Sequence, residues 1–351
     1  MKTEHILIIR FSAIGDVAMT VPVVYSLAKQ YPHLRITVLS RPFAKPFFEH
    51  LAPNVGFMEA DIKREYKGVK GLNALYRRLI AKQFTAIADF HNILRSNYLR
   101  IRFNLDSYRV EHINKHRHGK RLLTSNYNKR LTQQPTSFEN YAEVLERLGY
   151  PVKLEFETIY PDGPDLSKLP AGLLTEKTQD TPWIGIAPFA AHKGKIYPLE
   201  KMVKVIEKII ERNSNCRIFL FGGGADEHYI MNQWEKQFAQ CVNASAKLGD
   251  MEKELILMSL LDVMVSMDSA NMHLASLVNT PVVSIWGATH PYAGFLGWNQ
   301  SPENVIQLDM DCRPCSIYGK KKCLRGDYAC LNNLSPDIIA YRVNFILRAK
   351  R

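Results

Sequence analysis

Asp16 is the first side chain in the sequence whose type and position suit chemistry. The apolar residues 6–9 predict a buried strand, and the loop Phe11-Ser12-Ala13-Ile14-Gly15-Asp16 follows it before a helix that we expect over residues 17–30. Open α/β folds bind their ligands where such loops leave the C-terminal edge of a parallel sheet. Asp16 is therefore the first candidate for a functional residue.

A glycine-rich loop repeats this arrangement in the second half of the chain. Gly222-Gly223-Gly224 follows a predicted strand and is followed by Asp226 and Glu227 at the start of a helix. Glycines let the backbone approach a ligand closely, and a helix N-terminus offers N–H groups to an anion or a ribose. A plain turn is the alternative interpretation. The spacing differs from the G-x-G-x-x-G dinucleotide fingerprint, which disfavours a nicotinamide enzyme.

Two further loops carry charged groups at strand exits. Asp268 and Ser269 follow the apolar residues 263–266 and begin a predicted helix, which Asp268 could cap and whose N–H groups could hold a diphosphate; His273 lies one turn later. Lys193 and Lys195 follow the predicted strand at residues 183–187. A lysine there could neutralise charge on a departing phosphate, although a solvated loop lysine is the alternative.

The elements that must position these residues alternate along the chain. Apolar runs at residues 6–9, 35–39, 84–89, 183–187, 216–221, 263–266 and 282–286 predict short buried strands separated by helices. The sequence Pro161-Asp162-Gly163-Pro164-Asp165, with Pro170 after it, is the best linker candidate. At 351 residues the chain is long enough for two domains. We therefore predict two doubly wound α/β domains, over residues 1–165 and 166–351.

The net charge of +12 is concentrated in one region. Residues 61–130 contain 17 Lys or Arg and five Asp or Glu, so the rest of the chain is neutral overall. Such a concentration favours a polyanionic partner, either nucleic acid, an anionic membrane surface or a phosphorylated substrate. A solvated basic face is the alternative. The chain has neither a bilayer-spanning apolar stretch nor a leader pattern, so we expect a cytoplasmic protein.

Four cysteines form the remaining cluster. Cys312, Cys315, Cys323 and Cys330 lie within 19 residues, and four thiolates can hold zinc tetrahedrally. Their spacing is not that of a compact paired knuckle. Reduced or packing thiols are therefore the favoured interpretation, and zinc is the alternative.

Taken in order, these motifs resemble the heptosyltransferases of glycosyltransferase family 9. The resemblance rests on the Ser-x-x-Gly-Asp loop, the Lys-x-x-Pro element that ends at Pro198, and Asp-Ser-x-x-x-His followed by Trp286-Gly287-Ala288-Thr289-His290-Pro291. It extends to Asp89-Phe90-His91-Asn92 with Arg95-Ser96. It implies a GT-B fold, in which two Rossmann-like domains face across a cleft, the first binding the acceptor and the second the nucleotide-sugar donor. The C-terminal helix of such a chain can pack back on the first domain.

The resemblance also assigns roles to residues. It implies that Asp16 is the general base and that Lys195 contacts the donor phosphates. The other implied donor-site residues are Asp226, Glu227, Asp268, Ser269, Ala270, Asn271 and His273. Those implied or proposed for the acceptor are Arg10, Ser12, Lys63, Arg64, Lys67 and Arg95, the last four from the basic region.

The chemistry agrees with these roles. Displacing a nucleoside diphosphate with inversion needs a base on the acceptor side and positive charge or dipoles on the leaving-group side, so we expect no metal and no cofactor. The sequence thus predicts an inverting glycosyltransferase that moves heptose from ADP-heptose to a phosphorylated, lipid-linked lipopolysaccharide core acceptor. We expect it at the inner face of the cytoplasmic membrane, in contact with anionic lipid and without nucleic acid. Another nucleotide-sugar donor, or a basic nucleic-acid-binding protein, are the alternatives.

Overall fold

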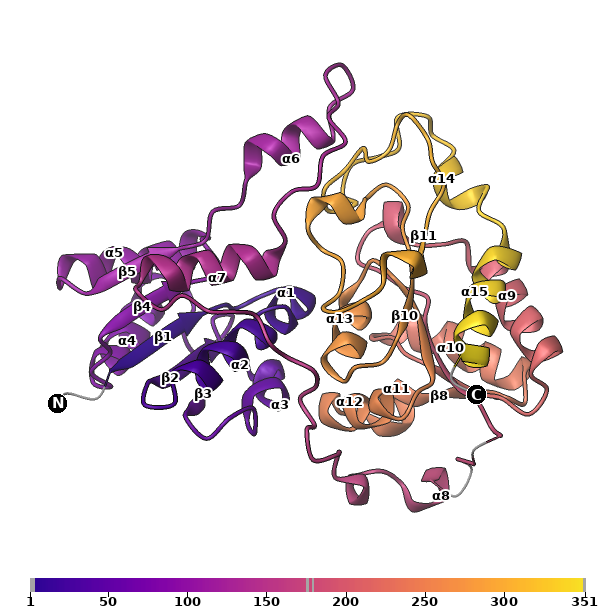
Figure 1. Cartoon of the computed structure of the whole chain (residues 1–351), viewed down its shortest axis with the longest axis horizontal. Helices are drawn as coiled ribbons and strands as arrows, with labels where there is room; N and C mark the ends of the chain where they lie inside the picture. The colour runs from indigo at the N-terminus through magenta and orange to yellow at the C-terminus, as the bar shows by residue number, and fades with distance from the viewer. Residues whose placement is uncertain (1–3, 175–176, 179, 350–351) are drawn as a thin grey trace. The chain divides into compact units, whose positions relative to one another are not determined.

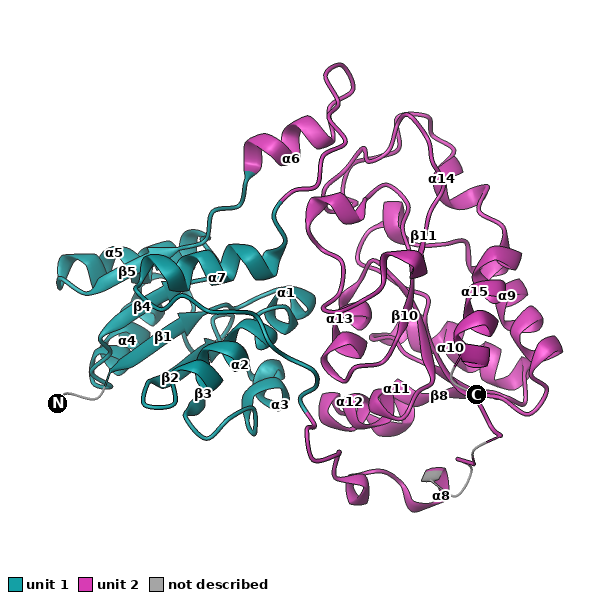
Figure 2. Ribbon diagram, in the orientation of Figure 1, with its two compact units in different colours: residues 1–116, 135–159 teal, residues 117–134, 160–351 magenta. Residues whose placement is uncertain are grey.

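The computed structural model describes residues 4–174, 177–178 and 180–349 and divides the chain into two compact units (Figures 1 and 2). Unit 1 comprises residues 1–116 and 135–159, and unit 2 comprises residues 117–134 and 160–351. The outermost residues of both predicted domain ranges, 1–3 and 350–351, lie outside the described residues. Residues 117–134 interrupt the sequence of unit 1 but belong to unit 2. Their helix α6 (Arg117–Leu123) packs against the short helix η4 (Pro291–Ala293) of unit 2.

Unit 1 is built on a five-stranded parallel sheet. Its order is β3-β2-β1-β4-β5, so β1 and β4 are central neighbours. The strands are β1 (His5–Ile9), β2 (Arg35–Ser40), β3 (Val55–Glu59), β4 (Ala86–Asp89) and β5 (Arg109–His112). Because all five run in parallel, the loops that follow them emerge at one edge of the sheet.

The helices of unit 1 connect these strands. They are α1 (Ile14–Ala18), α2 (Val21–Gln30), η1 (Pro42–Ala44), α3 (Lys45–Phe48), α4 (Gly68–Ile80), α5 (Leu94–Leu105) and α7 (Ser137–Arg147). The prediction of one helix over residues 17–30 is wrong. Pro22 has no N–H for an intrahelical bond, and the helix is interrupted at Met19 and Thr20 and restarts with Pro22 in its first turn.

Unit 2 contains a six-stranded parallel sheet in the order β11-β10-β9-β6-β7-β8. The strands are β6 (Trp183–Ala187), β7 (Arg217–Leu220), β8 (Cys241–Asn243), β9 (Val263–Met267), β10 (Val282–Ile285) and β11 (Val305–Ile306). Four of them, β10-β9-β6-β7, are neighbours in the middle of the sheet. Their exits carry the four motifs that the sequence singled out in this half.

Unit 2 also contains α-helices and short 3₁₀ helices. Besides α6 and η4 they are η2 (Leu166–Lys168), α8 (Ala171–Leu174), η3 (Lys193–Lys195), α9 (Leu199–Arg212), α10 (Ala225–Gln237), α11 (Ala244–Leu248), α12 (Met251–Ser259), α13 (Ala270–Leu277), η5 (Pro302–Asn304), α14 (Ala329–Asn332) and α15 (Pro336–Ala349). The C-terminal helix α15 packs against α9 of the same unit. Among the helices that the structure describes, none combines the length and apolar character needed to cross a lipid bilayer.

The predicted fold class, two doubly wound α/β domains, is confirmed by the two parallel sheets. All seven predicted strands are present. The four strands that the sequence did not predict, β3, β5, β8 and β11, are the four edge strands of the two sheets. β3 and β5 include exposed residues, and β8 and β11 are three and two residues long, so none of the four is a long continuous apolar run that would identify it in the sequence.

Candidate functional site

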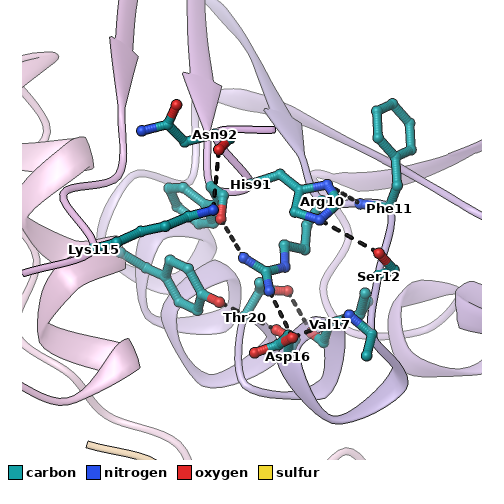
Figure 3. A network of polar contacts seen from close by, with 12 residues as sticks. Arg10, Phe11, Ser12, Asp16, Val17, Thr20, His91, Asn92 and Lys115 are labelled. Atoms are coloured by element: carbon teal, nitrogen blue, oxygen red, sulfur yellow. Dashed lines mark hydrogen bonds and ion pairs between the residues drawn. The ribbon is translucent and has the colours of Figure 1, made fainter. Parts of the chain in front are cut away.

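In unit 1, Asp16 is held at the exit of β1 by Arg10 (Figure 3). Arg10 Nη2 lies 2.8 Å from Asp16 Oδ2, and Arg10 Nη1 donates to the carbonyl of Phe90, 2.7 Å away. The backbone N–H of Ala13 also donates to Asp16 Oδ2. The Arg10 side chain is 9% exposed, whereas that of Asp16 is 34% exposed. The buried cation therefore orients a carboxylate that solvent, or a ligand, can still reach.

His91 lies beside this pair because β4 is the neighbour of β1. His91 Nδ1 accepts from the backbone N–H of Phe11, so the ring carries its proton on Nε2, which faces Ser12 Oγ 3.4 Å away (Figure 3). Burial, with the positive charge of Arg10 second, lowers the pKa of His91 to about 3. His91 is therefore a neutral donor that orients the Ser12 hydroxyl.

The neutral His91 makes a pH-dependent contribution to stability. Its pKa is about 3 in the folded protein against 6.5 ordinarily, so below pH 6.5 the unfolded chain takes up a proton that the folded protein refuses. Lowering the pH from 7.5 to 5.5 should therefore reduce the free energy of unfolding by about 1.4 kcal/mol through this group. The measurement is urea unfolding of the wild type and of His91→Asn at both pH values. The free energy of unfolding should fall by about 1.4 kcal/mol less in the variant than in the wild type. Equal losses in the two proteins would contradict the lowered pKa of His91.

Two residues quoted in the family resemblance shape the backbone of this loop. The fully buried carboxylate of Asp89 accepts from the backbone N–H groups of His91 and Asn92, both at 2.9 Å. Ser96, the third residue of α5, accepts at its Oγ from the N–H of the N-cap residue Ile93. These side chains thus fix the turn that presents His91.

The structure distributes the predicted acceptor residues over two places. Arg10 and Ser12 lie beside Asp16, and the exposed Arg95 is close enough to lower the pKa of His91. Lys63, Arg64 and Lys67 are exposed on the loop after β3, which is an edge strand two positions from β1.

Lys115 is a neighbour of this site that the sequence interpretation did not select. Its Nζ donates to the carbonyl of Asn92 at 3.0 Å, and its charge also lowers the pKa of His91. It comes from the loop after the edge strand β5, and no local pattern distinguished it from other lysines.

The basic region at residues 61–130 is divided between the two units. Its last five basic residues belong to unit 2: Arg117, Lys120, Arg121, Lys129 and Arg130. Lys120 is buried, with its ammonium over the ring of Phe295, and Lys129 Nζ donates to the carbonyl of Pro314. Part of the charge that we assigned to a polyanionic partner therefore serves packing inside unit 2.

In unit 2, Lys195 and Asp268 form an ion pair at the exits of two neighbouring strands. Lys195 follows β6, Asp268 follows β9, and Lys195 Nζ lies 2.9 Å from Asp268 Oδ2. Both side chains are largely buried, so the carboxylate fixes the position of the ammonium. Lys193 points elsewhere, because its Nζ lies over the ring of Tyr328.

Asp268 does not cap the following helix, contrary to the interpretation from sequence. The N-cap of α13 is Ser269, whose side chain makes no capping hydrogen bond in the described structure, while the Asp268 carboxylate is turned to Lys195. The first N–H groups of α13, from Ala270 and Asn271 onward, are therefore left without a side-chain cap, which suits an anion. His273 is buried in the same helix.

The two acidic residues after the glycine loop, Asp226 and Glu227, have different environments. Glu227 Oε2 accepts from the N–H of Gly223 at 2.7 Å and so closes the loop. Gly224 is the N-cap of α10 with φ +91°, a conformation that favours glycine. Asp226 is exposed in the first turn. Asp226 is thus the better placed of the two carboxylates to meet a ligand.

A long loop between β11 and α14 supports Lys195. The stem of Lys195 lies against Gly319, whose φ is +74°; a Cβ added there would be 2.5 Å from Lys195 Cγ. Arg313 anchors this loop, since its buried guanidinium donates to the carbonyls of Gly287, Trp286 and Thr289. Gly319 is therefore a positioning residue for Lys195 that no sequence motif indicated.

The four cysteines of this loop were the candidate metal ligands. Within residues 4–174, 177–178 and 180–349, no group of three or more His, Cys, Asp or Glu side chains is arranged to hold a metal ion. Cys330 packs in the hydrophobic core of unit 2, and burial raises the pKa of its thiol to about 11, so it stays protonated. Zinc at Cys312, Cys315, Cys323 and Cys330 therefore stays an alternative to the favoured interpretation of reduced or packing thiols.

Comparisons with known proteins show which family and fold the chain shares. A family model described as glycosyltransferase family 9 (heptosyltransferase) matches residues 72–324. Lipopolysaccharide heptosyltransferase 1 of Campylobacter coli is 24% identical over 300 residues, which are 82% of this chain and 85% of that protein.

Two solved structures share the fold over almost the full length. A family 9 glycosyltransferase from Veillonella parvula has a TM-score of 0.73 at 17% identity and covers 99% of this chain and 98% of its own. The E. coli heptosyltransferase WaaC with ADP has a TM-score of 0.66 at 16% identity and covers 97% of this chain and 99% of its own. The predicted GT-B fold class is thereby confirmed.

Proposed function

Because the chain belongs to glycosyltransferase family 9, we propose that this glycosyltransferase is a heptosyltransferase that moves heptose from ADP-heptose to a phosphorylated saccharide of the lipopolysaccharide core. The heptosyltransferase names of its relatives and the ADP in the WaaC structure support this choice of donor. The observation in this chain that carries the proposal is the Lys195–Asp268 ion pair at the uncapped start of α13.

We assign donor binding to unit 2. The diphosphate would accept hydrogen bonds from the first N–H groups of α13 and from Lys195 Nζ, which stabilise charge on the leaving phosphate. Ser269, Ala270 and Asn271 supply that backbone, and His273 lies in the same helix. Asp226, at the start of α10, would accept from the ribose hydroxyls, while Glu227 keeps the glycine loop closed.

We assign acceptor binding and proton removal to unit 1. The acceptor oxygen forms a bond to the anomeric carbon as the bond from that carbon to the diphosphate breaks, which inverts the anomeric configuration. The hydroxyl proton passes to Asp16, and ADP leaves with the bonding electrons. Arg10 orients Asp16 toward the acceptor and adds positive potential there, the exposed Arg95 offers a direct contact to acceptor phosphates, and Lys63, Arg64 and Lys67 form a second basic group.

This chemistry requires no metal ion in our proposal, because Lys195 and the helix dipole of α13 provide the positive potential. It also requires no further cofactor. The lipid-linked acceptor places the protein at an anionic membrane surface on the cytoplasmic side.

The proposal is tested by thermal unfolding with ADP, UDP and GDP. A ligand present at about 100 times its Kd adds about 2.7 kcal/mol to the free energy of unfolding, so the midpoint should rise with ADP at concentrations where UDP and GDP leave it unchanged. ADP release from ADP-heptose, dependent on a lipopolysaccharide core acceptor, is the companion assay. A larger rise with UDP or GDP would point to a different sugar donor on the same fold.

A further inference from the structure

Helix α5 of unit 1 carries a row of exposed apolar side chains. Leu94 is 88% exposed, Ile101 57% and Leu105 74%. These positions follow the spacing i, i+7, i+11, so they lie on one face of the helix, opposite the face through which Leu99 and Phe103 enter the core. A helix with two apolar faces, only one of which is buried, is the mark of a binding surface.

The surface beside this row is basic. Helix α4 packs against α5, where Asn73 Oδ1 accepts from the hydroxyl of Tyr98 and from Nη1 of Arg102. Lys70 and Arg77, one turn to either side of Asn73 on α4, are exposed. Helices α4 and α5 together contain six Lys and Arg and no Asp or Glu. Arg78, Arg100 and Arg102 have partners within unit 1, and the exposed Asp106 follows Leu105 at the end of α5, so Lys70, Arg77 and Arg95 are the cations that this surface offers.

We propose that this α4–α5 surface, consisting of Leu94, Ile101 and Leu105 with Lys70, Arg77 and Arg95, binds an anionic lipid bilayer. Aliphatic side chains inserted at the depth of the headgroups, together with cations that contact the lipid phosphates, are the features of helices that lie in a membrane interface. The row extends about 16 Å along the helix, so it lies on the bilayer without spanning it.

The charge distribution selects lipid over other occupants. A second copy of this chain docked through α5 would bring two such acid-free helix pairs together, and like charges at an interface oppose association. The phosphates of a nucleic acid could pair with the cations. Proteins that bind single strands also stack the bases on aromatic side chains, whereas the exposed row of α5 is aliphatic. An anionic membrane complements both the charge and the apolar row.

The location of α5 connects this surface to the proposed acceptor site. Leu94 is three residues after His91, and the same turn at the exit of β4 presents both. A bilayer under α5 would therefore hold lipid-linked acceptors close to the loops that carry Arg10 and Asp16. This step rests on the proposed function, whereas the binding of lipid does not.

The test is sedimentation of the full chain with sucrose-loaded vesicles, either of phosphatidylcholine alone or with 30% phosphatidylglycerol, without any substrate. We expect binding to the anionic vesicles that weakens as salt is raised. The triple variant Leu94→Ser, Ile101→Ser, Leu105→Ser should reduce the partition coefficient at least tenfold, and Lys70→Gln with Arg77→Gln should reduce it about 30-fold on anionic vesicles only.

A matched control removes a comparable apolar row elsewhere. Ile338, Tyr341 and Phe345 are partly exposed on α15 of unit 2, and their replacement by Ser should leave vesicle binding unchanged. The proposal is overturned if the α15 variant loses binding while the α5 variant keeps it. It is also overturned if the α5 variant alters only the oligomeric state in sedimentation equilibrium. Because no donor or acceptor is present, neither result depends on the proposed reaction.

Discussion

Replacing Asp16 with Asn is expected to lower the turnover number of sugar transfer about 1,000-fold and to leave ADP binding unchanged. Asn keeps an oxygen that can accept from the N–H of Ala13, but it cannot take a proton from the acceptor hydroxyl. General-base catalysis contributes about 10²- to 10⁴-fold to rate, which sets the expected loss. The measurement is ADP release under saturating donor and acceptor, with the ADP-induced rise in unfolding temperature as the check on donor binding. Asp16→Ala should lose as much activity or more.

Glu139 offers the matched control for Asp16. It occupies the same third position of helix α7, where its carboxylate accepts from the N–H of the N-cap residue Thr136. Glu139→Gln therefore repeats the change from carboxylate to amide at a helix start and should keep wild-type turnover. If Asp16→Asn retained a tenth or more of wild-type turnover, Asp16 would be only the partner of Arg10 and not the base.

Replacing Lys195 with Ala is expected to weaken ADP binding at least tenfold and to lower kcat by about 10²- to 10³-fold. A hydrogen bond to a charged group is worth about 1.5–3 kcal/mol, and a donor to developing negative charge about 10²- to 10³-fold in rate. Lys193→Ala, two residues away, is the control and should change neither quantity, since Lys193 lies over Tyr328. ADP titration and steady-state kinetics separate the two effects.

The loss of Lys195 also leaves the buried Asp268 carboxylate without its cation, which can reduce stability. The double variant Lys195→Ala, Asp268→Asn removes the unpaired charge and should restore the unfolding temperature without restoring activity. Recovery of transfer in the double variant would show that Lys195 serves stability alone.

Gly319→Ala is also expected to lower kcat, because the new Cβ would push the stem of Lys195 aside. Gly326 is the control: its φ is +80°, similar to the +74° of Gly319, but a Cβ there meets nothing within 4 Å. Gly319→Ala should reduce kcat well beyond Gly326→Ala in the wild type. In a Lys195→Ala background, Gly319→Ala and Gly326→Ala should change kcat equally. A larger loss of kcat with Gly319→Ala in that background would show that Gly319 does not act through Lys195.

Local sequence was sufficient to predict the elements that carry the candidate site residues. The central strands β1, β4, β6, β7, β9 and β10 are buried on both faces, so each is a continuous apolar run, and the loop that follows is fixed within a few residues of it. For that reason the apolar runs alone identify Asp16, Lys195 and Asp268 as strand-exit residues. The edge strands lack this signal. The break before α2 coincides with Pro22, which has no N–H for an intrahelical bond, whereas the apolar pattern of residues 17–30 continues through it.

Only the tertiary structure decided which of the loops that follow the strands become neighbours. Lys195 and Asp268 are 73 residues apart in the sequence, and their ion pair exists because β6 and β9 are adjacent in the sheet. The contact of His91 with Ser12 depends in the same way on the pairing of β1 with β4.

The sequence by itself thus determined the order of strands and helices and the loops with functional side chains, because the periodicity of burial and the chemistry of a turn are local properties. The tertiary structure decided the partners that are distant in the sequence: His91 for Ser12, Asp268 for Lys195, and Gly319 beneath the Lys195 stem. It also assigned residues 117–134 to unit 2 and left one apolar face of α5 in solvent. These depend on strand order and on packing between distant segments, which hydrophobic periodicity does not specify.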